Sequence, residues 1–300
     1  MNGNGEDLKA NIRDWWANHP MTYGLDHGST EFVDQNGVTQ TVDFGSRAFF
    51  QRADETFFSW NTPLHGPAGP FSRLFPFERF KGKRVLEVGC GMGCMAMQWA
   101  LQGAEVAAVD LNPVAVEQTR RRFAAFGLPG DIREADGENL PFDTDSFDYV
   151  YSWGVLHHSP HTAKSVGHLL RVLKPGGESG VMLYHRHSLL HAYQTRWVEG
   201  FLNMEDAFLD EVALAGRYSD GGRDEGNPHT WPVTRQEVRD VLFKGYDEVE
   251  IRTLGTEVGS VLDHLLPGLG SRILPRSILK ALARRWGWSL WITGRKPAMR

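Results

Sequence analysis

The sequence predicts an α/β protein with a largely parallel sheet covered by helices. Three observations indicate this fold. Residues 85–93 read VLEVGCGMG, an apolar strand that runs directly into a glycine-rich turn. An acid, Asp110, ends the next apolar run about 20 residues after Gly89. Strand-like and helix-like segments then alternate as far as Tyr184.

The first elements follow from local pattern. Residues 85–88 are apolar apart from one acid and form a short strand. The glycines that follow allow a tight turn and a close approach of backbone to ligand, because they carry no Cβ. A helix is expected over 94–101 and a second strand over 105–109. Together these make a βαβ unit whose acid could receive ribose hydroxyls.

Further strands and helices complete the sheet. A third strand is expected over 132–136 and a fourth over 149–153, followed by a helix from about Thr162 to Leu173. The Lys-Pro-Gly-Gly run at 174–177 ends that helix, and a fifth strand covers 179–184. Residues 247–253 and 287–296 have strand character as well. Thr234 and Glu237 form a capping box for a helix over 235–244.

Four regions are expected along the chain. Residues 1–80 form a helical, aromatic-rich cap, with helices over 10–18 and 47–60. Residues 81–185 are the ligand-binding core, and 186–240 are a substrate-side insertion, mostly helical at first. Residues 241–300 complete the sheet and carry a basic helical insertion.

The glycine loop also indicates its ligand. The spacing is G-x-G-x-G rather than the G-x-G-x-x-G of dinucleotide sites, and Glu87 stands two residues before Gly89. A carboxylate there suits a ligand that carries an ammonium group and opposes a pyrophosphate. S-adenosylmethionine carries an ammonium and a sulfonium and has no phosphate. Taken alone, the loop could also be a glycine-rich turn with a structural Glu.

The motifs after the loop strengthen this interpretation. The order LPFDTDSFD (140–148), GVLHH (154–158) and RVLKPGG (171–177) resembles the class I S-adenosylmethionine-dependent methyltransferases. Within that family it is similar to the small-molecule branch of the ubiquinone and menaquinone C-methyltransferases. The resemblance covers 84–184 and is thin elsewhere. It implies a Rossmann-like seven-stranded methyltransferase sheet whose last strand is antiparallel, inserted between the fifth and sixth.

The resemblance also implies a set of cofactor-binding residues. Asp110 would take the two ribose hydroxyls, and Leu111 would lie against the adenine face. Asp136, with Gly137 beside it, would accept from the adenine amino group, although Asp before Gly is also a common turn pair. The remaining expected cofactor residues are Glu87, Gly89, Cys90, Gly91 and Gly93 in the loop, and Ser152 and Trp153 beside the methionine part.

Methyl transfer from a sulfonium is an in-line displacement with a neutral leaving thioether. Alignment of the acceptor with the methyl group therefore supplies most of the rate enhancement. A general base is needed only where the nucleophile keeps its proton, as a hydroxyl does. The candidate acceptor-side residues are Tyr23, His157, His158, Tyr184 and His185. Each has a structural alternative: the histidines as loop residues bonded to backbone, Tyr23 as a core aromatic of the cap.

The histidines at 185, 187 and 191 could form a metal site only if their rings converged. No Cys, Asp or Glu joins them between 185 and 198, so we expect no metal.

Composition excludes several classes. The contents of 41 % hydrophobic and 23 % charged residues are those of ordinary globular proteins. The net charge of −5 argues against a nucleic-acid partner. Two cysteines, Cys90 and Cys94, cannot build a disulfide framework, and the first residues do not read as a secretory signal. A cytoplasmic protein is therefore expected.

One segment is strongly basic. Residues 271–300 hold eight Lys and Arg and no Asp or Glu, and 272–286 have the pattern of a basic amphipathic helix. Such a helix either packs on the core with a solvated basic face or contacts an anionic membrane surface.

The sequence thus predicts a methyltransferase that uses S-adenosylmethionine and acts on a small, partly apolar molecule at an O, S, C or N atom. A non-catalytic cofactor-binding or scaffold protein would keep the same loop. A nicotinamide oxidoreductase is disfavoured by Glu87 and by the loop spacing. A nucleic-acid methyltransferase is disfavoured because Ser-Trp-Gly-Val at 152–155 replaces an N-P-P-Y-type motif.

Overall fold

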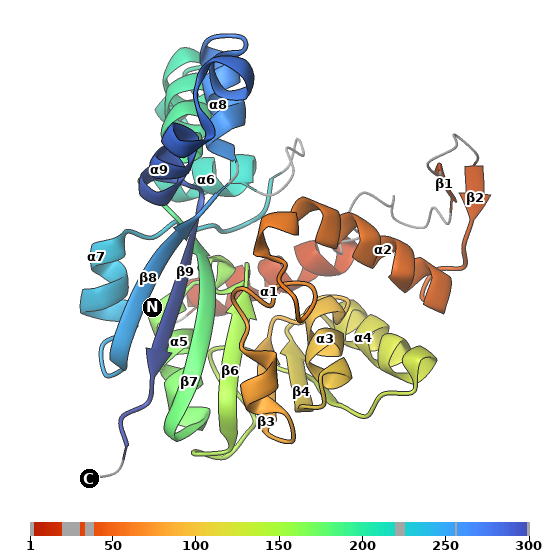
Figure 1. Ribbon diagram of the computed structural model, residues 1–300. Helices are drawn as coiled ribbons and strands as arrows, with labels where there is room; N and C mark the ends of the chain where they lie inside the picture. The colour runs from red at the N-terminus through yellow and green to blue at the C-terminus, as the bar shows by residue number, and fades with distance from the viewer. Residues whose placement is uncertain (1–2, 20–30, 34–38, 220–225, 256, 299–300) are drawn as a thin grey trace. The chain divides into compact units, whose positions relative to one another are not determined.

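The structure is a computed structural model that divides into two units. The glycine-loop unit comprises Arg13–Tyr151 and Val172–Lys174, and the histidine unit comprises Met1–Ile12, Ser152–Arg171 and Pro175–Arg300. Figure 1 labels helices and strands of both units. The residues described are 3–19, 31–33, 39–219, 226–255 and 257–298.

The sheet confirms the predicted fold class. Its seven strands run in the order β5-β4-β3-β6-β7-β9-β8. The pairs β3–β4, β3–β6 and β4–β5 are parallel, whereas β9 is antiparallel to both β7 and β8. This is a mixed Rossmann-like sheet, with the last strand between the fifth and sixth strands of that sheet as expected.

The glycine-loop unit has the predicted βαβ start. Its elements are β3 (Arg84–Val88), α3 (Cys94–Leu101), β4 (Glu105–Asp110), α4 (Pro113–Phe126), β5 (Asp131–Glu134) and β6 (Phe147–Trp153, whose last two residues belong to the histidine unit). Asn112 caps α4 by accepting from the Val114 amide at 2.8 Å. Gly127 ends the same helix in the left-handed conformation, which an L side chain resists.

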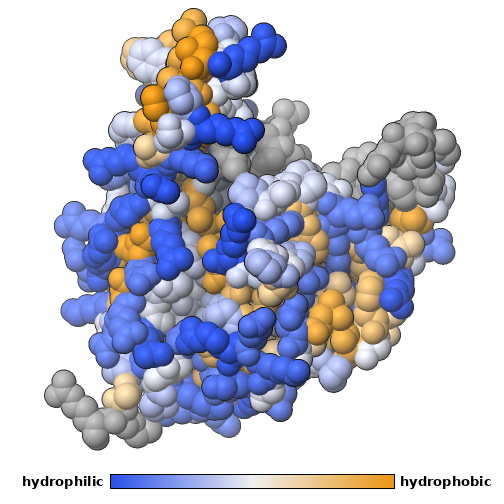
Figure 2. Space-filling model, viewed as in Figure 1, coloured by the Kyte–Doolittle hydropathy of each residue, from blue (hydrophilic) through white to orange (hydrophobic). Residues whose placement is uncertain are grey.

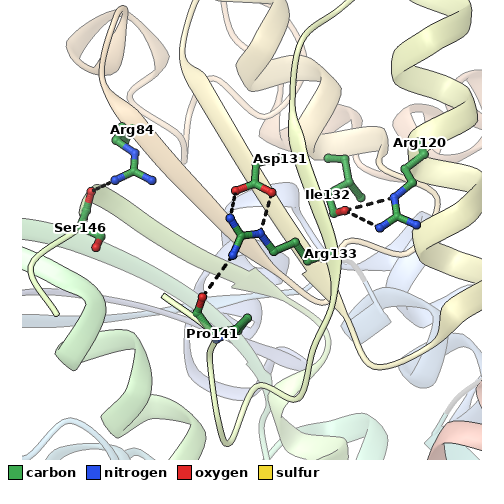
Figure 3. A network of polar contacts seen from close by, with 7 residues as sticks. All are labelled: Arg84, Arg120, Asp131, Ile132, Arg133, Pro141 and Ser146. Carbon is green, nitrogen blue, oxygen red and sulfur yellow. Dashed lines mark hydrogen bonds and ion pairs between the residues drawn. The ribbon is translucent and has the colours of Figure 1, made fainter. Parts of the chain in front are cut away.

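Arginines fasten the strand ends of this unit (Figure 3). Arg133 makes a bidentate contact to Asp131 at 2.6–2.7 Å and reaches the Pro141 carbonyl at 3.3 Å. Arg120, on α4, donates twice to the Ile132 carbonyl of β5. Arg84, on β3, donates to the Ser146 carbonyl. The helix and the loop before β6 are therefore tied to the strands they flank.

Two helices precede β3 in the chain, α1 (Gly3–Asn18) and α2 (Arg47–Trp60), with a small hairpin of β1 (Glu31–Val33) and β2 (Thr39–Thr41) between them. Two short 3₁₀ turns, η1 (Thr62–Leu64) and η2 (Phe77–Phe80), follow. In the glycine-loop unit, α2 packs against α4 through a buried ion pair. Arg122 Nη1 lies 2.7 Å from both oxygens of Asp54, and the guanidinium stands over the Phe50 ring.

The histidine unit contains the antiparallel part of the sheet, in which β9 (Ser289–Arg295) lies between β7 (Leu173–Tyr184) and β8 (Asp247–Leu254) (Figure 1). The remaining elements of its part of the chain are η3 (Leu156–His158), α5 (Thr162–Val172), η4 (His191–Leu202), η5 (Glu205–Ala207), α6 (Glu211–Ser219), α7 (Arg235–Glu237), η6 (Val238–Leu242), α8 (Glu257–Leu265), η7 (Leu269–Ile273) and α9 (Arg276–Trp286). The helical character expected over 257–286 is therefore present.

Two elements differ from the sequence expectation. β7 begins at Leu173, immediately after α5, whereas a start at Ser179 was expected. The early part of β7 pairs with a residue beyond the predicted core of 81–185, since the Gly176 amide donates to the Lys296 carbonyl. The helix expected over 235–244 is a short α-helix with the predicted capping box, and it continues as a π-helical turn that ends at Leu242.

Candidate cofactor and acceptor sites

The glycine loop turns sharply after β3. Gly89 and Cys90 both donate to the Val109 carbonyl, and Gly89, Gly91 and Gly93 all have positive φ. A Cβ at Gly93 would lie 2.7 Å from the Thr119 side chain, so this position excludes other residues by space as well as by backbone conformation. Thr119 also donates to the Gly91 carbonyl at 2.9 Å. Sequence analysis missed Thr119, since nothing in α4 marks it.

Asp110 is joined to this loop. Its Oδ2 accepts from the Gly91 amide at 2.8 Å, and its Oδ1 accepts from the Asn112 amide at 2.9 Å. Burial raises the pKa of Asp110, and these backbone bonds oppose the increase. The Leu111 amide also stabilises the carboxylate. A carboxylate offers about four acceptor positions, so capacity for a ligand donor remains after these backbone bonds are made. The acid is therefore oriented at the carboxyl end of β4 with room to accept from a ligand.

Glu87 lies beneath the loop and is almost completely buried. Burial raises its pKa to about 8, and the Tyr151 hydroxyl and the Ala96 amide oppose this. Its Oε2 has no hydrogen-bond partner among the residues that the structure describes. A buried carboxyl of this kind is stabilised by a cation, which would return it to the ionised form.

The predicted adenine-side residues follow β4 and β5. Asp136 Oδ1 accepts from the Glu138 amide at 2.8 Å, which is the turn geometry that an Asp before Gly137 commonly forms. Leu111 is half-buried, directly after Asp110. Whether Asp136 also accepts from a ligand stays a prediction.

The second half of α1 is fastened beside these strand ends. Asn112 Nδ2 donates to the Trp16 carbonyl at 2.8 Å, and Arg13 pairs with Glu134 at 2.6 Å. Asn112 follows β4 and Glu134 ends β5. Within the glycine-loop unit, the N-terminal helix therefore borders the edge of the sheet where open α/β folds bind ligands.

In the histidine unit, the structure brings together several of the predicted acceptor-side residues. The His157 and Tyr184 rings are 3.8 Å apart between centroids, and the His158 ring is 4.3 Å from His157. His157 is fully buried, and neither ring nitrogen has a hydrogen-bond partner among the described residues. Burial lowers its pKa well below the usual value, so the ring is neutral. Ser152 is buried, and Trp153 contacts the Trp291 ring.

His158 has a defined tautomer. Its Nδ1 lies 2.9 Å from the His229 carbonyl and 3.1 Å from Thr230 Oγ1, and the Thr230 hydroxyl itself donates to Asn227. Because the carbonyl can only accept, Nδ1 carries the proton, and in the neutral ring Nε2 carries the lone pair.

Other aromatic residues extend this group. Trp288 stacks on Tyr184 at 4.4 Å, and the His191 ring is 6.2 Å from Trp288. Burial lowers the pKa of His191 to about 4, and neither of its nitrogens is bonded within the described part of the chain. His185 is bonded from Nδ1 to the Gly287 carbonyl at 3.1 Å. Nothing in the local sequence marks Trp288 or Thr230, which lie 104 and 72 residues from their partners Tyr184 and His158.

Two other expectations concern Tyr23 and a possible metal site. Tyr23 lies outside the described residues. Within the described ranges, no cluster of three or more His, Cys, Asp or Glu side chains is placed to hold a metal ion.

Comparison with known proteins finds sequence similarity over part of the chain. Residues 85–177 match a family described as "Methyltransferase domain". A phthiotriol/phenolphthiotriol dimycocerosates methyltransferase of Mycobacterium leprae is 41 % identical over 98 residues, and one from Mycobacterium ulcerans is 41 % identical over 109 residues. These matches cover 32 % and 36 % of this chain and only 36 % and 40 % of the two relatives.

Solved structures support the fold. A Bacillus halodurans protein aligns over 76 % of this chain and 98 % of its own, with a TM-score of 0.50 and 19 % identity. A Pyrococcus horikoshii protein aligns over 81 % of this chain and 92 % of its own, with a TM-score of 0.50 and 17 % identity. Identities this low indicate a common fold.

Proposed function

We propose that this protein is an S-adenosylmethionine-dependent methyltransferase that acts on a small-molecule acceptor. The observation that carries the proposal is Asp110, a carboxylate at the end of β4 that the glycine loop already orients, with acceptor capacity left for the ribose. Support comes from the matched methyltransferase-domain segment. The buried carboxyl of Glu87 favours a ligand that bears an ammonium group over one that bears a pyrophosphate.

The donor is assigned to the glycine-loop unit. Asp110 would hold the ribose, Leu111 the adenine face, and Asp136 with Gly137 the adenine amino group. The loop residues would follow the methionine part, and Ser152 and Trp153 stay proposed residues for that part of the donor. S-adenosylmethionine supplies an activated methyl group, and this chain's residues bind it, orient it and exclude water.

The acceptor we propose is a hydroxyl group on an apolar, lipid-like molecule. The curated relatives are named for phthiotriol dimycocerosates, and a triol carries hydroxyl groups. The likeness to the ubiquinone and menaquinone C-methyltransferases makes transfer to carbon the alternative.

A hydroxyl acceptor gives His158 a role. The hydroxyl must lose its proton as the new bond forms, and a neutral imidazole whose Nδ1–H is bonded to a carbonyl can take that proton at Nε2. Tyr184 and His157 would lie on the acceptor side, and His185 and Tyr23 stay proposed contributors to it. A carbon acceptor that is already electron-rich can attack the methyl group without a base, so such an acceptor would not need His158.

Calorimetric titration tests the donor assignment. Purified protein is titrated with S-adenosylhomocysteine, and NAD serves as the control ligand. Binding of the first without the second is the expected result. Binding of NAD alone would reverse the assignment in favour of an oxidoreductase. If neither bound, the loop would be a scaffold feature.

The catalytic part is tested separately. Labelled S-adenosylmethionine is incubated with hydroxyl-bearing and quinol-type lipids, and extracted label is counted. The His158→Gln variant should lose turnover on a hydroxyl while binding S-adenosylhomocysteine normally. Protein that binds the cofactor and labels no acceptor would favour the non-catalytic alternative.

A further inference from the structure

The segment 264–286 of the histidine unit exposes apolar side chains that the fold does not cover. Leu265, Leu266 and Ile273 are each more than half exposed, and no acid occurs from 264 onward. Figure 2 shows hydrophobic and hydrophilic side chains side by side over the helices that Figure 1 labels α8 and α9. Single exposed apolar residues are ordinary, whereas a run of them on one segment marks an interaction surface.

Helix α9 is amphipathic but has no buried residue. Its basic side carries Arg276, Lys280 and Arg284, at the i, i+4 spacing that places them on one stripe. On the other side Leu279 and Leu282 are half-buried, whereas Ile278 and Trp286 remain 44 % and 42 % exposed. A helix that only packs on a core would have buried its whole apolar side.

The basic residues are available for a partner. Arg272, Arg276, Lys280, Arg284 and Arg285 are all exposed. None of the five forms an ion pair with a carboxylate in the part of the chain that the structure describes. Positive charge next to uncovered apolar side chains, with a tryptophan among them, is the composition of helices that lie in a lipid–water interface.

Hydrogen bonds and close backbone packing hold the loop between α8 and α9 in place. Asp263 Oδ1 accepts from the amides of Gly270 and Ser271 at 2.6 and 3.0 Å. Gly270 packs so closely on Gly259 that a Cβ there would meet the Gly259 carbonyl oxygen at 2.1 Å. The apolar side chains of this segment are therefore presented on a fixed scaffold, which lowers the ordering cost of binding.

We infer that this segment, 264–286, docks on the surface of an anionic phospholipid bilayer. Its apolar side chains would enter the interface while the five basic residues meet lipid phosphates. No helix in the described residues is long and apolar enough to cross a bilayer, so the contact is with the surface. The inference does not depend on the proposed methyl transfer, because it concerns a lipid surface and not the donor.

The test is co-sedimentation of the full chain with vesicles of phosphatidylcholine alone or mixed with phosphatidylglycerol, at low and high salt. Binding is expected only to the mixed vesicles at low salt. Each charge reversal, Arg276→Glu or Lys280→Glu, should weaken it about 30-fold, since reversal changes the charge by two units and each unit near such a surface contributes about 1 kcal/mol.

Neutral polar variants separate insertion from simple attraction, because they remove an apolar side chain and leave the charge unchanged. Ile273→Asn should greatly weaken sedimentation, whereas Val241→Asn, at an exposed apolar residue outside the segment, should leave it unchanged. Circular dichroism and unfolding confirm that each variant is folded. The inference is wrong if the parent protein does not bind the mixed vesicles. It is also wrong if Ile273→Asn binds like the parent, which would indicate charge attraction alone. Light scattering that showed a dimer lost in Ile273→Asn would instead assign the surface to a second copy of the chain.

Discussion

Asp110 holds the loop and is expected to hold the ligand, so its replacement has two effects. Asp110→Ala removes the acceptor for Gly91 and Asn112 as well as for the ribose. Affinity for S-adenosylhomocysteine should fall about 10- to 150-fold for each ribose hydrogen bond lost, because one hydrogen bond to a charged group is worth roughly 1.5–3 kcal/mol. Calorimetry measures the change.

Asp131→Ala is the matched control for that variant. Asp131 begins β5 and pairs with Arg133 on the surface, so its loss should leave affinity unchanged. Parental affinity in Asp110→Ala would show that the acid does not bind the ribose.

The raised pKa of the buried Glu87 carboxyl predicts that ligand binding releases a proton. Its pKa of about 8 leaves it mostly protonated at neutral pH, whereas a bound ammonium would favour the ionised form. Binding of S-adenosylhomocysteine at pH 7 should therefore release a proton, and affinity should rise between pH 6 and 8, by at most tenfold per unit. Calorimetry in two buffers of different ionisation enthalpy measures the released proton. Glu87→Gln should remove both effects, and an unchanged proton count in that variant would contradict the assignment.

At the level of elements, α2 and α4 are joined by a buried ion pair. Asp54→Ala would leave the fully buried Arg122 without its carboxylate, at a cost of about 3–5 kcal/mol in the free energy of unfolding. The double variant Asp54→Leu/Arg122→Met should recover most of that loss. Urea unfolding measures both. Glu55→Ala removes an exposed carboxylate one residue away and should change stability by less than about 1 kcal/mol. A double variant no more stable than Asp54→Ala would contradict this account.

The elements that sequence could predict are those with a local signal. Helix 94–101 has the predicted bounds, and β3 and β4 begin or end within one residue of theirs, since glycine turns and apolar runs delimit them. β7 starts six residues early, because pairing with distant residues, not local propensity, recruits Leu173 onward. The π-helical form of η4 likewise has no local pattern to predict it.

The candidate site divides in the same way. The loop residues of the proposed cofactor site, Glu87 to Gly93, belong to one short motif and could be proposed from it. The ring group of the histidine unit could be named only in part, because His157 and Tyr184 lie in the matched segment or next to it, while Trp288 arrives with the last strand. Contacts made by residues a hundred positions apart leave no trace in a single sequence.

At the scale of the whole molecule, buried titratable groups predict a stability maximum near pH 6.5. Burial lowers the pKa values of His157 and His191, so below about pH 6.5 the unfolded chain binds protons that the folded chain does not, and stability falls with pH. Glu87 acts in the opposite sense: its raised pKa contributes stability that is lost as pH rises towards 8. Each group changes the free energy of unfolding by at most about 1.4 kcal/mol per pH unit.

Urea unfolding at pH 5.5, 6.5 and 8 measures this profile. The His191→Phe variant should flatten the acid side and Glu87→Gln the alkaline side. A profile that still fell on the acid side to the same extent in His191→Phe would contradict the role assigned to that ring.

The position of β9 has a consequence for how the protein is made. β9 pairs with β7 on one side and β8 on the other, although it is the last strand in the chain. During synthesis, β7 and β8 must therefore wait for residues near 295 to leave the ribosome before either has that neighbour. A chain cut before Ser289 would carry two open strand edges, which are the surfaces that promote aggregation. Loss of the residues from Ser289 onward would thus affect solubility although it removes none of the proposed ligand-binding residues.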